Sequence, residues 1–536
     1  QMSFRENDTQ QLSFFSSLSG LTEREKTALD RSWAKVFADD IFPSIDEERF
    51  RCLYSDKASR PNSPVNVIIG ALILKELFDL SDDEVVEDLM LDPRFQYALH
   101  TTEFEEQPLS DKSLTRFRQR CYDHERLTGE DIYHGCITDL AAKTAKMMKI
   151  DGRIRRMDSL MIEANIRKLS RMELIYKCIA KLVNYLNGKH RSDLIPSMEH
   201  YCEADDFNRV IYHSRSTDTD ERMEKLLNDA DVLLEKCGHD FDDITEYQLF
   251  VRCLSEQTTV EGEKRRLRTA DDRMMTSGIM QSPADPDATY RSKAGRSHRG
   301  YVANVVEAVG ESGSLVTDFQ VETNNTSDSA MLKDSLAGME PQKEKVIVVT
   351  DAAYSGTENT ELAASKNIEL ITTDLTGRDV PESAADFELN EAGTKVLKCP
   401  AGHEPRSSSY TRQTGMCTAS FDRDLCAGCK YKDQCNAKIF KRVAKIKISR
   451  KKIERAKIKI KMQTEEYRFY ARLRNGVETI PSILKNLYHV DRMPVRRKIR
   501  CKFFIGAKIS ALNFRKLFRY RKGLGHYAKN PLLCGQ

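Results

Sequence analysis

The chain has 536 residues, too many for one compact core, which predicts two to four domains or one interrupted domain. Hydrophobic residues make up 40%, but no apolar run approaches the roughly 18 residues that cross a bilayer, so we expect no membrane partner. The net charge of +3 decides little, because acidic and basic residues are unevenly distributed. The first residues lack a secretory signal, which favours a cytoplasmic protein with reduced cysteines.

Residues 1–145 are predicted to form a helical amino-terminal domain. An apolar pattern begins at Pro64, which suits the first turn of a helix, and continues to Leu80. Ser81 and Ser110 then stand where helix N-caps are expected. Short helices with tight turns also build helix-turn-helix DNA readers, so we expect this domain to bind DNA ends, with a solvated helical surface as the alternative.

The sequence pattern changes after this domain, where residues 150–159 are predicted to form a strand ending at Asp158. The predicted elements that follow are a hairpin of strands 301–307 and 314–321, a helix at 328–338, a buried strand at 346–350, a helix at 356–366 and a strand at 368–372. This order predicts an α/β fold with a mixed sheet flanked by helices.

Two insertions are predicted to interrupt that core, which comprises residues 146–171, 291–375 and 463–525. Residues 172–290 are mostly charged and helical in pattern, with few strand signals, which predicts a helical insertion. Residues 376–462 contain most of the clustered cysteines, followed by a lysine-rich segment that we expect to be a helix.

Three carboxylates stand out by their positions in these elements. Asp158 and Asp351 follow predicted strands, and Glu478 lies on a long predicted helix near the end of the core. Carboxylates at one edge of a sheet can bind hard divalent cations, and two such ions can activate a water or a 3′-hydroxyl for attack on phosphorus. Aspartates at strand ends are also common as turn or cap residues, which is the alternative for either one alone.

The predicted helix around Glu478 also carries cations. Arg474 and Lys485 lie four residues before and seven residues after Glu478, so all three would share one helix face. This arrangement suits a phosphate site, although an ordinary ion pair within the helix would give the same spacing. Pro481 should kink or restart the helix just after the glutamate.

The cysteine cluster predicts a zinc-binding insertion. The preferred four ligands are Cys399, Cys426, Cys429 and Cys435, with His403 or Cys417 as substitutes. Thiolates at two-residue spacing can hold zinc in tetrahedral geometry. Unligated thiols remain the alternative, and an iron–sulfur cluster fits the closing spacing poorly.

Basic tracts surround the position of Glu478. About half of the residues from Lys438 to Lys461 are Lys or Arg, and a second tract follows the glutamate. The residues that we expect to contact phosphates are Arg450, Lys451, Lys452, Arg496 and Arg497. A helix with such a basic face would bind DNA without regard to sequence and in a salt-sensitive way, whereas a solvated helix is the alternative.

Five segments together resemble the DDE transposases of bacterial insertion sequences. They are Met157 to Asn165, Gly300-Tyr301-Val302-Ala303, Asn325-Thr326-Ser327-Asp328, Val349 to Tyr354, and Ala507 to Leu517 around Asn513. The resemblance covers nearly the whole chain and implies an RNase H-like core with a helical amino-terminal domain. In that family a tyrosine, an arginine, the catalytic glutamate and a lysine share the last helix. Arg474, Glu478 and Lys485 fit that spacing, whereas Ala471 occupies the tyrosine position and Tyr470 precedes it.

The resemblance implies that Asp158, Asp351 and Glu478 hold two Mg²⁺ or Mn²⁺ ions. Hydrolysis would free a 3′-hydroxyl at the transposon end, which would then attack target DNA. Arg474, Lys485 and Tyr470 would contact phosphates of the bound DNA end. The expected partners are double-stranded DNA, as terminal inverted repeats and as target, and a second copy of the chain on that DNA, at the nucleoid in the bacterial cytoplasm. The alternatives are a non-catalytic DNA-binding protein derived from such an element and a nuclease on the same core.

Overall fold

The computed structural model describes residues 2–7, 16–55, 57, 61–103, 107–212, 218–262, 264–272, 276–293, 295–354, 356–372, 379–476 and 479–524. The chain divides into two compact units. The first unit comprises Gln1–Asp151, Ser159–Ser327 and Pro481–Gln536, and the second comprises Gly152–Asp158 and Asp328–Ile480. Among the helices described, none is long and apolar enough to span a membrane.

The amino-terminal region of the first unit is helical, as predicted. Its helices are α1 (Glu23–Asp30), α2 (Trp33–Val36), α3 (Val65–Phe78), α4 (Asp82–Leu91), α5 (Pro93–Ala98), α6 (Asp111–Thr128) and α7 (Ile132–Met147). Helix α3 begins directly after Pro64 and is buried on nearly all sides. Helix α4 begins with a capping box, in which the Glu84 N–H donates to Ser81 Oγ at 3.1 Å and the Ser81 N–H donates to Glu84 Oε2 at 2.6 Å.

A six-stranded mixed sheet forms the centre of the fold. Its strands are β1 (Ile154–Glu163), β4 (Thr289–Lys293), β5 (Arg296–Gly310), β6 (Gly313–Thr323), β7 (Val346–Thr350) and β8 (Ile368–Thr372). The hydrogen-bonded order is β4-β5-β1-β7-β8, and β6 pairs with β5. The β5–β6 hairpin is antiparallel, whereas β1, β7 and β8 run parallel. The predicted mixed sheet is therefore confirmed.

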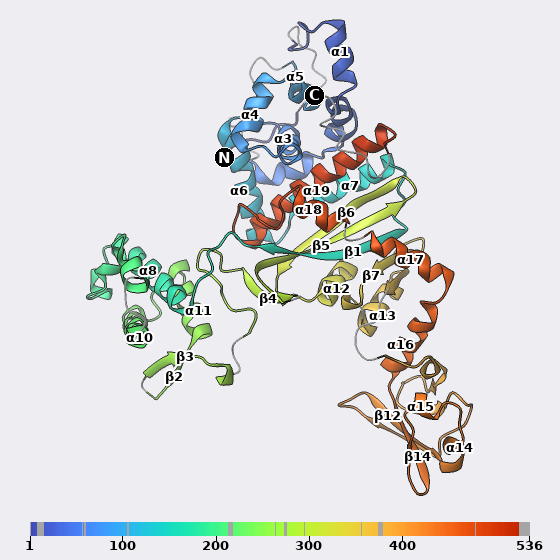
Figure 1. Cartoon of the computed structure of the whole chain (residues 1–536). Helices are drawn as coiled ribbons and strands as arrows, with labels where there is room; N and C mark the ends of the chain where they lie inside the picture. The colour runs from blue at the N-terminus through green and yellow to red at the C-terminus, as the bar shows by residue number, and fades with distance from the viewer. Residues whose placement is uncertain are drawn as a thin grey trace. The chain divides into compact units, whose positions relative to one another are not determined.

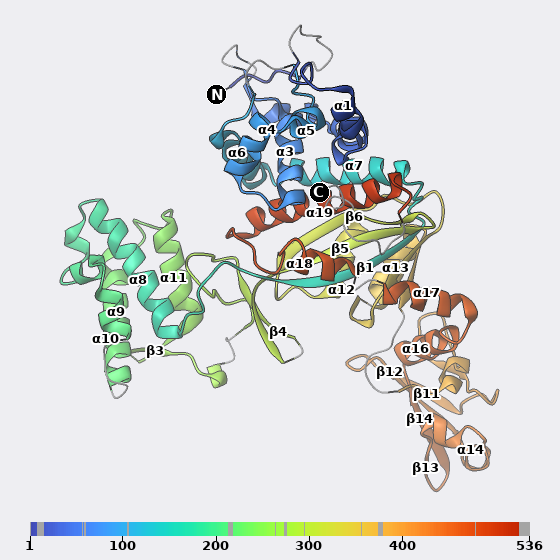
Figure 2. The ribbon, with the colours of Figure 1, turned by 45° about the horizontal axis from the view of Figure 1, so that its top comes forward.

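Two helices cover the hairpin of this sheet within the first unit. Helices α7 and α19 (Lys498–Arg521) lie side by side and pack on β6 (Figures 1 and 2). Asn513 of α19 joins the layers, because its Nδ2 donates to Val316 O at 2.7 Å and its Oδ1 accepts from Val316 N at 3.1 Å. An amide side chain thus satisfies backbone groups of β6 that no neighbouring strand reaches.

Close packing between strands explains one of the segments that carries the family resemblance. Gly300 has φ +147°, and a Cβ placed on it would lie 2.3 Å from Ile162 O of β1. Tyr301, the next residue, is fully buried and donates from its hydroxyl to Asp285 Oδ1 at 2.5 Å. Gly300 therefore allows β5 to approach β1 closely, and Tyr301 anchors β5.

In the second unit, helices surround the parallel strands. They are α12 (Asp328–Gly338), α13 (Thr357–Ser365) and α17 (Glu465–Asn475), with the short 3-10 turn η8 (Ala352–Tyr354) between β7 and α13. Helix α13 packs on β8 and α17 packs on β7. Val349, Ile371, Tyr467 and Tyr470 form a buried cluster between these elements.

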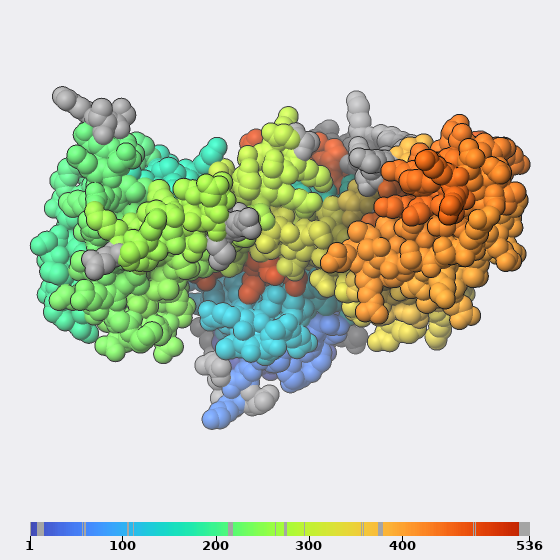
Figure 3. Space-filling view, turned by 90° about the horizontal axis from the view of Figure 1, so that it is seen from below, coloured from blue at the N-terminus to red at the C-terminus, as the bar shows by residue number. Residues whose placement is uncertain are grey.

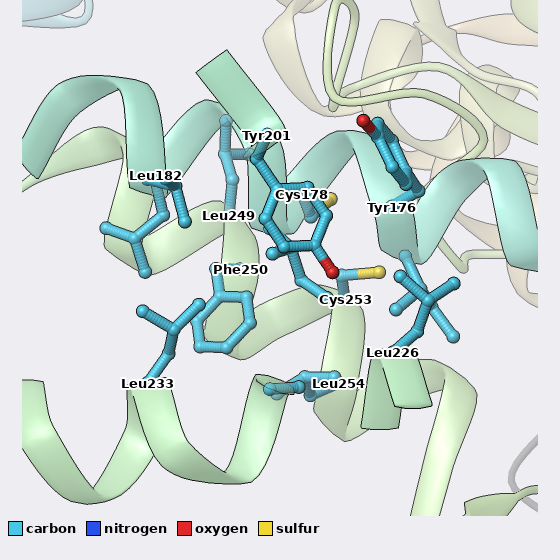
Figure 4. Close-up of a cluster of buried hydrophobic side chains, with 14 of the residues drawn as sticks. Tyr176, Cys178, Leu182, Tyr201, Leu226, Leu233, Leu249, Phe250, Cys253 and Leu254 are labelled. Carbon is cyan, nitrogen blue, oxygen red and sulfur yellow. The ribbon is translucent and has the colours of Figure 1, made fainter. Parts of the chain in front are cut away.

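The region after β1 is a helical insertion in the first unit. It contains α8 (Arg171–Gly188), α9 (Asp206–Ile211), α10 (Thr219–Cys237) and α11 (Thr245–Gln257), followed by the short hairpin β2 (Thr258–Glu261) and β3 (Lys264–Leu267). The insertion has an apolar core of its own, in which Leu182, Leu233 and Phe250 pack together (Figure 4).

The cysteine-rich segment of the second unit is built on short strands. They are the pair β9 (Glu388–Leu389) and β10 (Val396–Lys398), and a four-stranded antiparallel sheet in the order β11 (Ser407–Thr411), β12 (Met416–Asp422), β14 (Val443–Ile448) and β13 (Lys438–Ile439). The helices of this segment are η9 (Glu382–Asp386), α14 (Arg423–Ala427), α15 (Lys432–Cys435) and α16 (Arg450–Lys461). Figure 3 shows the segment in orange at the surface.

The lysine-rich segment from 438 to 461 is only partly helical. The expected helix begins at Arg450, and residues 443–448 form β14 instead. Their sequence, Val-Ala-Lys-Ile-Lys-Ile, alternates with a period of two, so a strand buries the isoleucines on one face. The prediction of a single basic helix over this segment was wrong.

Candidate functional site

Asp351 lies immediately after β7, as the sequence predicts. Strand β7 is apolar and mostly buried, and the chain turns into η8 directly beyond it. The Asp351 side chain is 28% exposed, and its Oδ1 accepts a hydrogen bond from Ala353 N at 2.8 Å. The turn thus holds one carboxylate oxygen, and the other, Oδ2, lies 3.8 Å from Arg474 Nη2.

Asp158 lies within β1, which continues to Glu163 rather than ending at the aspartate as expected. Beyond Asp158, β1 follows β5 of the first unit, and this pairing prolongs the strand. Before it, Ile154, Arg155 and Arg156 pair with Ile347, Val348 and Val349 of β7, at a constant offset (347 − 154 = 193). Two residues further on, the same offset makes Asp158 level with Asp351, on strands that lie about 4.8 Å apart.

Arg474, near the end of α17, is the cation nearest to this strand end. Its Nη2 lies 3.8 Å from Asp351 Oδ2, and its side chain is 23% exposed. Its Nε is buried and has no hydrogen-bond partner among the described residues. A guanidinium usually satisfies all its donors when buried, so Arg474 has capacity for a further acceptor.

Arg156 fixes the end of α17 against β1. Its Nη1 donates to Leu473 O at 2.8 Å. A Cβ placed on Gly476 would come within 2.5 Å of the same Nη1, so a larger residue there would displace the end of the Arg156 side chain. This contact keeps Arg474 beside the β1–β7 pair, and sequence reasoning did not find it.

Asn359 of α13 supports the turn that carries Asp351. It is 2% exposed, and its Nδ2 donates to Ser329 O at 3.0 Å and to Tyr354 O at 3.1 Å. Tyr354, at the end of the turn, is fully buried. These contacts join η8 to the start of α12, and no sequence motif indicated the role of Asn359.

Glu478, the third predicted carboxylate, lies outside the described residues. The long helix expected around it is two helices, because α17 ends at Asn475 and α18 (Thr479–Asn486) begins at Thr479. Gly476 favours a helix end, and Pro481 fits the first turn of a new helix. The argument that Arg474 and Lys485 share one continuous helix face therefore does not hold.

The other predicted DNA contacts differ in exposure. Lys485 is half-buried in α18, in the first unit. Tyr470 is 6% exposed in the cluster with Val349 and Ile371, so it acts as a core residue in the described structure. Arg496 and Arg497 are exposed before α19, where Arg496 Nε donates to Asn165 O at 2.7 Å.

The three basic residues at the start of α16 are also unequal. Arg450 pairs with Glu454 at 2.9 Å and lies 3.8 Å from Glu361. Lys451 is exposed, and Lys452 is half-buried. Arg450 and Lys451 are thus both exposed, and Arg450 is engaged with a carboxylate.

Hard carboxylate oxygens of Asp158 and Asp351 suit a divalent cation such as Mg²⁺. Within the described part of the chain, no group of three or more His, Cys, Asp or Glu side chains is arranged to hold a metal ion. Because Glu478 lies outside that part, the predicted set of three carboxylates is not covered by this statement.

The four preferred cysteines line one small pocket together with His403. They are Cys399, Cys426, Cys429 and Cys435, and all four are free thiols. Burial, and then the neighbouring thiols, raise the pKa of Cys435 to about 11. Cys417 is not among the residues that line the pocket; it is fully buried, and its thiol donates to Gly393 O at 3.5 Å.

Comparisons with known proteins point to one family. Residues 258–514 match the family described as Transposase DDE domain, and residues 27–120 match the family described as Transposase domain (DUF772). The first range includes Asp351 and Glu478, whereas Asp158 precedes it. No curated protein matches the chain.

One solved structure is similar, the cryo-EM structure of a piggyBac transposase synaptic complex with hairpin DNA. It is 8% identical, the match covers 92% of this chain and 76% of that chain, and the TM-score is 0.29, too low to support an argument. The two family matches cover the helical amino-terminal region and most of the core beyond the helical insertion. The two family matches therefore indicate a transposase with a DDE domain.

Proposed function

We propose that the chain cleaves DNA at the ends of an insertion sequence and joins those ends to target DNA, with Asp158, Asp351 and Glu478 as the catalytic carboxylates. The observations that support this proposal are the parallel register of β1 and β7, which would bring Asp158 level with Asp351 if it is extended by two residues, and the position of Arg474 beside Asp351. Two carboxylates and a cation with a spare donor suit a phosphodiester held at the edge of a sheet.

We further propose that the core is RNase H-like, formed by residues 146–171, 291–375 and 463–525, with 172–290 and 376–462 as insertions and 1–145 as the domain that binds DNA ends. The strand order supports this proposal. Taken in chain order, β1, β5, β6, β7 and β8 are arranged in space as third, second, first, fourth and fifth. This is the order that the family resemblance implies.

The site residues would have distinct roles in the reaction. The three carboxylates would hold two Mg²⁺ or Mn²⁺ ions, which supply an activated nucleophile and charge stabilisation at the leaving oxygen. Arg474 would donate to a phosphate oxygen of the DNA end, and Arg156 and Asn359 would position Arg474 and Asp351. Charge-assisted hydrogen bonds of this kind are roughly twice as strong as neutral ones.

The partners would be the terminal inverted repeats and the target duplex, on the bacterial nucleoid. Both ends of an element must be handled together, so we propose that two copies of the chain act on DNA. The exposed residues Arg496, Arg497 and Lys451 and the half-buried Lys485 are the basic residues that would contact phosphates.

The joining reaction separates this function from its alternatives. Purified wild-type protein would be mixed with pre-cleaved inverted-repeat DNA, a supercoiled target and Mg²⁺ or Mn²⁺. The proposed function predicts a covalent end-to-target product that requires the divalent ion. Nicking without joining would instead identify a nuclease, and metal-independent binding without either product would identify a DNA-binding derivative.

We also propose that Cys399, Cys426, Cys429 and Cys435 bind a structural zinc ion. The described side-chain positions do not form a metal-ligand set, so the support is their shared pocket and their soft donor chemistry. The Cys399 C=O accepts from Gly402 N at 2.8 Å, and the Cys426 C=O accepts from Cys429 N at 3.4 Å, so each of these cysteines begins a tight turn.

Elemental analysis of the purified protein tests the zinc proposal. We expect about one zinc per chain, lost when Cys426 and Cys429 are both replaced by Ser. The matched control is Cys52→Ser, because Cys52 is an exposed free thiol outside the pocket. Zinc-free wild-type protein, or zinc retained in the double variant, would rule the site out.

A further inference from the structure

The four-stranded sheet of the cysteine-rich segment has one buried face. On β12 it presents Cys417, Ala419 and Phe421, and on β14 it presents Ala444, Ile446 and Ile448, all of which are less than 4% exposed. These side chains form the apolar core of the segment. Because side chains alternate along a strand, the residues between them face the opposite side of the sheet.

That opposite face, which we call the lysine face, is polar and basic. Its members fall in two cross-strand rows, Lys438–Lys445–Ser420–Ser407 and Lys447–Thr418–Ser409. The three lysines are exposed, and the other members of these two rows are Ser and Thr; Met416 and the Asp422–Val443 pair lie on the same side at the ends of the rows. The two rows thus present ammonium and hydroxyl groups, and apart from the lysines their side chains are short.

The charges on this face are not balanced by the protein. Lys438 stands directly opposite Lys445 on the neighbouring strand, and like charges in such a pair destabilise a sheet. No described acidic side chain forms an ion pair with any of the three lysines. Asp422, the acidic residue of β12, is instead paired with Arg406. A bound polyanion would offset this repulsion.

The turn that joins β13 to β14 adds further cations at the same end of the sheet. It closes with a hydrogen bond from Phe440 N to Val443 O at 2.8 Å and carries the exposed cations Lys441 and Arg442. The Phe440 ring is 50% exposed, and the Lys445 ammonium lies 5.6 Å from its centroid. The turn therefore extends the positive surface.

We infer that the lysine face binds the sugar–phosphate backbone of duplex DNA without reading its sequence. The inference rests on the proposed function, for which it names a second DNA contact distinct from the carboxylate site. Lysine and serine or threonine side chains are typical partners of phosphate oxygens, and they position DNA rather than specify bases. Apart from the three lysines, the Ser and Thr side chains of the two rows are too short to enter a DNA groove.

The test is the salt dependence of binding to a duplex that lacks the inverted repeats. The full-length protein would carry Lys438→Gln, Lys445→Gln and Lys447→Gln together. Each phosphate contact contributes about 0.9 to the slope of log affinity against log salt, so the triple variant should lose roughly 2 to 3 from that slope. Its melting temperature should be unchanged or higher, because the like-charge pair is removed.

The matched control removes the same charge from the helical insertion. It replaces Lys225, Lys236 and Lys264, which are exposed, by Gln. We expect the control to change the slope by less than 1. Equal slopes for the two variants would overturn the inference, as would tighter binding of the wild-type protein to duplex RNA than to duplex DNA.

Two further measurements keep the conclusions separate. If the triple variant fails to fold, Lys447→Gln alone should reduce the slope by about 1, and no reduction would overturn the inference. Joining of pre-cleaved ends is measured on the same preparations. Absence of joining by the wild-type protein would count against the proposed function. Intact joining with an unchanged salt slope in the variant would count against DNA binding by the lysine face.

Discussion

At the scale of single residues, the site depends on contacts that lie far apart in the sequence. Arg156 and Leu473 are 317 residues apart, yet their hydrogen bond fixes the end of α17. The position of Asp351 directly after β7 could be predicted, because an apolar strand and the residue that follows it leave a local pattern, whereas β1 continues past Asp158. The supporting roles of Arg156 and Asn359 could not, because their partners are determined only when the elements pack.

Asn359→Ala should impair catalysis by releasing the turn that holds Asp351. The change removes the hydrogen bonds that Asn359 Nδ2 donates to the Ser329 and Tyr354 carbonyls, which costs about 1–3 kcal/mol of stability. We expect kcat for joining to fall well below that of wild type at temperatures where both proteins are folded, with KM for DNA little changed.

Asn208→Ala is the control for this change. Asn208 makes an exposed side-chain hydrogen bond within the helical insertion, to Asp205 Oδ1 at 3.1 Å. We expect its kcat to match wild type. If Asn359→Ala loses stability while keeping its full kcat, Asn359 has a structural role alone.

At the scale of elements, local patterns predicted the core well. The strands at 346–350 and 368–372 and the helix at 328–338 are found as β7, β8 and α12. Their apolar runs are bounded by turn residues, so local preference and burial agree. The lysine-rich strand β14 was missed because its charge suggested a helix, although the alternation of lysine and isoleucine indicates a strand.

Asn513→Ala should loosen the packing of α19 on β6. Both hydrogen bonds between the Asn513 amide and the Val316 backbone would be lost at a site where the side chain is 4% exposed. We expect a loss of about 1–3 kcal/mol in the free energy of unfolding, measured by urea denaturation. Ser314→Ala, which removes one hydrogen bond from Lys516 of α19 while Glu307 still accepts from Lys516, is the comparison and should cost less. An equal effect of the two changes would contradict the role of Asn513.

The helical insertion should lose stability in acid through Asp206. Burial would raise the pKa of this carboxyl, but hydrogen bonds from Tyr176, His200 and Arg209 outweigh it, and the pKa is lowered. A carboxyl whose pKa is lowered in the folded state stabilises the fold at pH values above its unfolded pKa, which is about 3.9. This contribution is lost as the pH falls through the folded pKa.

Hydrogen exchange of peptides from α8 and α9, after incubation at different pH values, measures this effect. Wild-type protein should be protected at pH 6 and lose protection below about pH 4. Asp206→Asn should be less protected at pH 6 and show a flatter pH profile. A wild-type profile that is flat between pH 6 and pH 3 would contradict the assignment.

At the scale of the whole molecule, function follows the distribution of charge rather than its sum. The net charge of +3 gives little indication of a DNA-binding protein, whereas Asp158, Asp351 and Arg474 gather in the second unit. The order of the predicted elements correctly gave the mixed α/β fold. Pro481 predicted a kink or restart of the helix near Glu478, but the end of α17 at Asn475 was not predicted, because Gly476 permits a helix end without requiring one.

The central claim is that Asp351 is a catalytic carboxylate, and metal-dependent cleavage and joining of inverted-repeat DNA by Asp351→Asn tests it most directly. Asparagine keeps the oxygen that accepts from Ala353 N, so the turn should persist while the charge is lost. We expect activity to fall by roughly 100-fold or more. Asp433→Asn, at an exposed position of α15, should retain wild-type activity. Equal activity of Asp351→Asn and wild type would contradict the account.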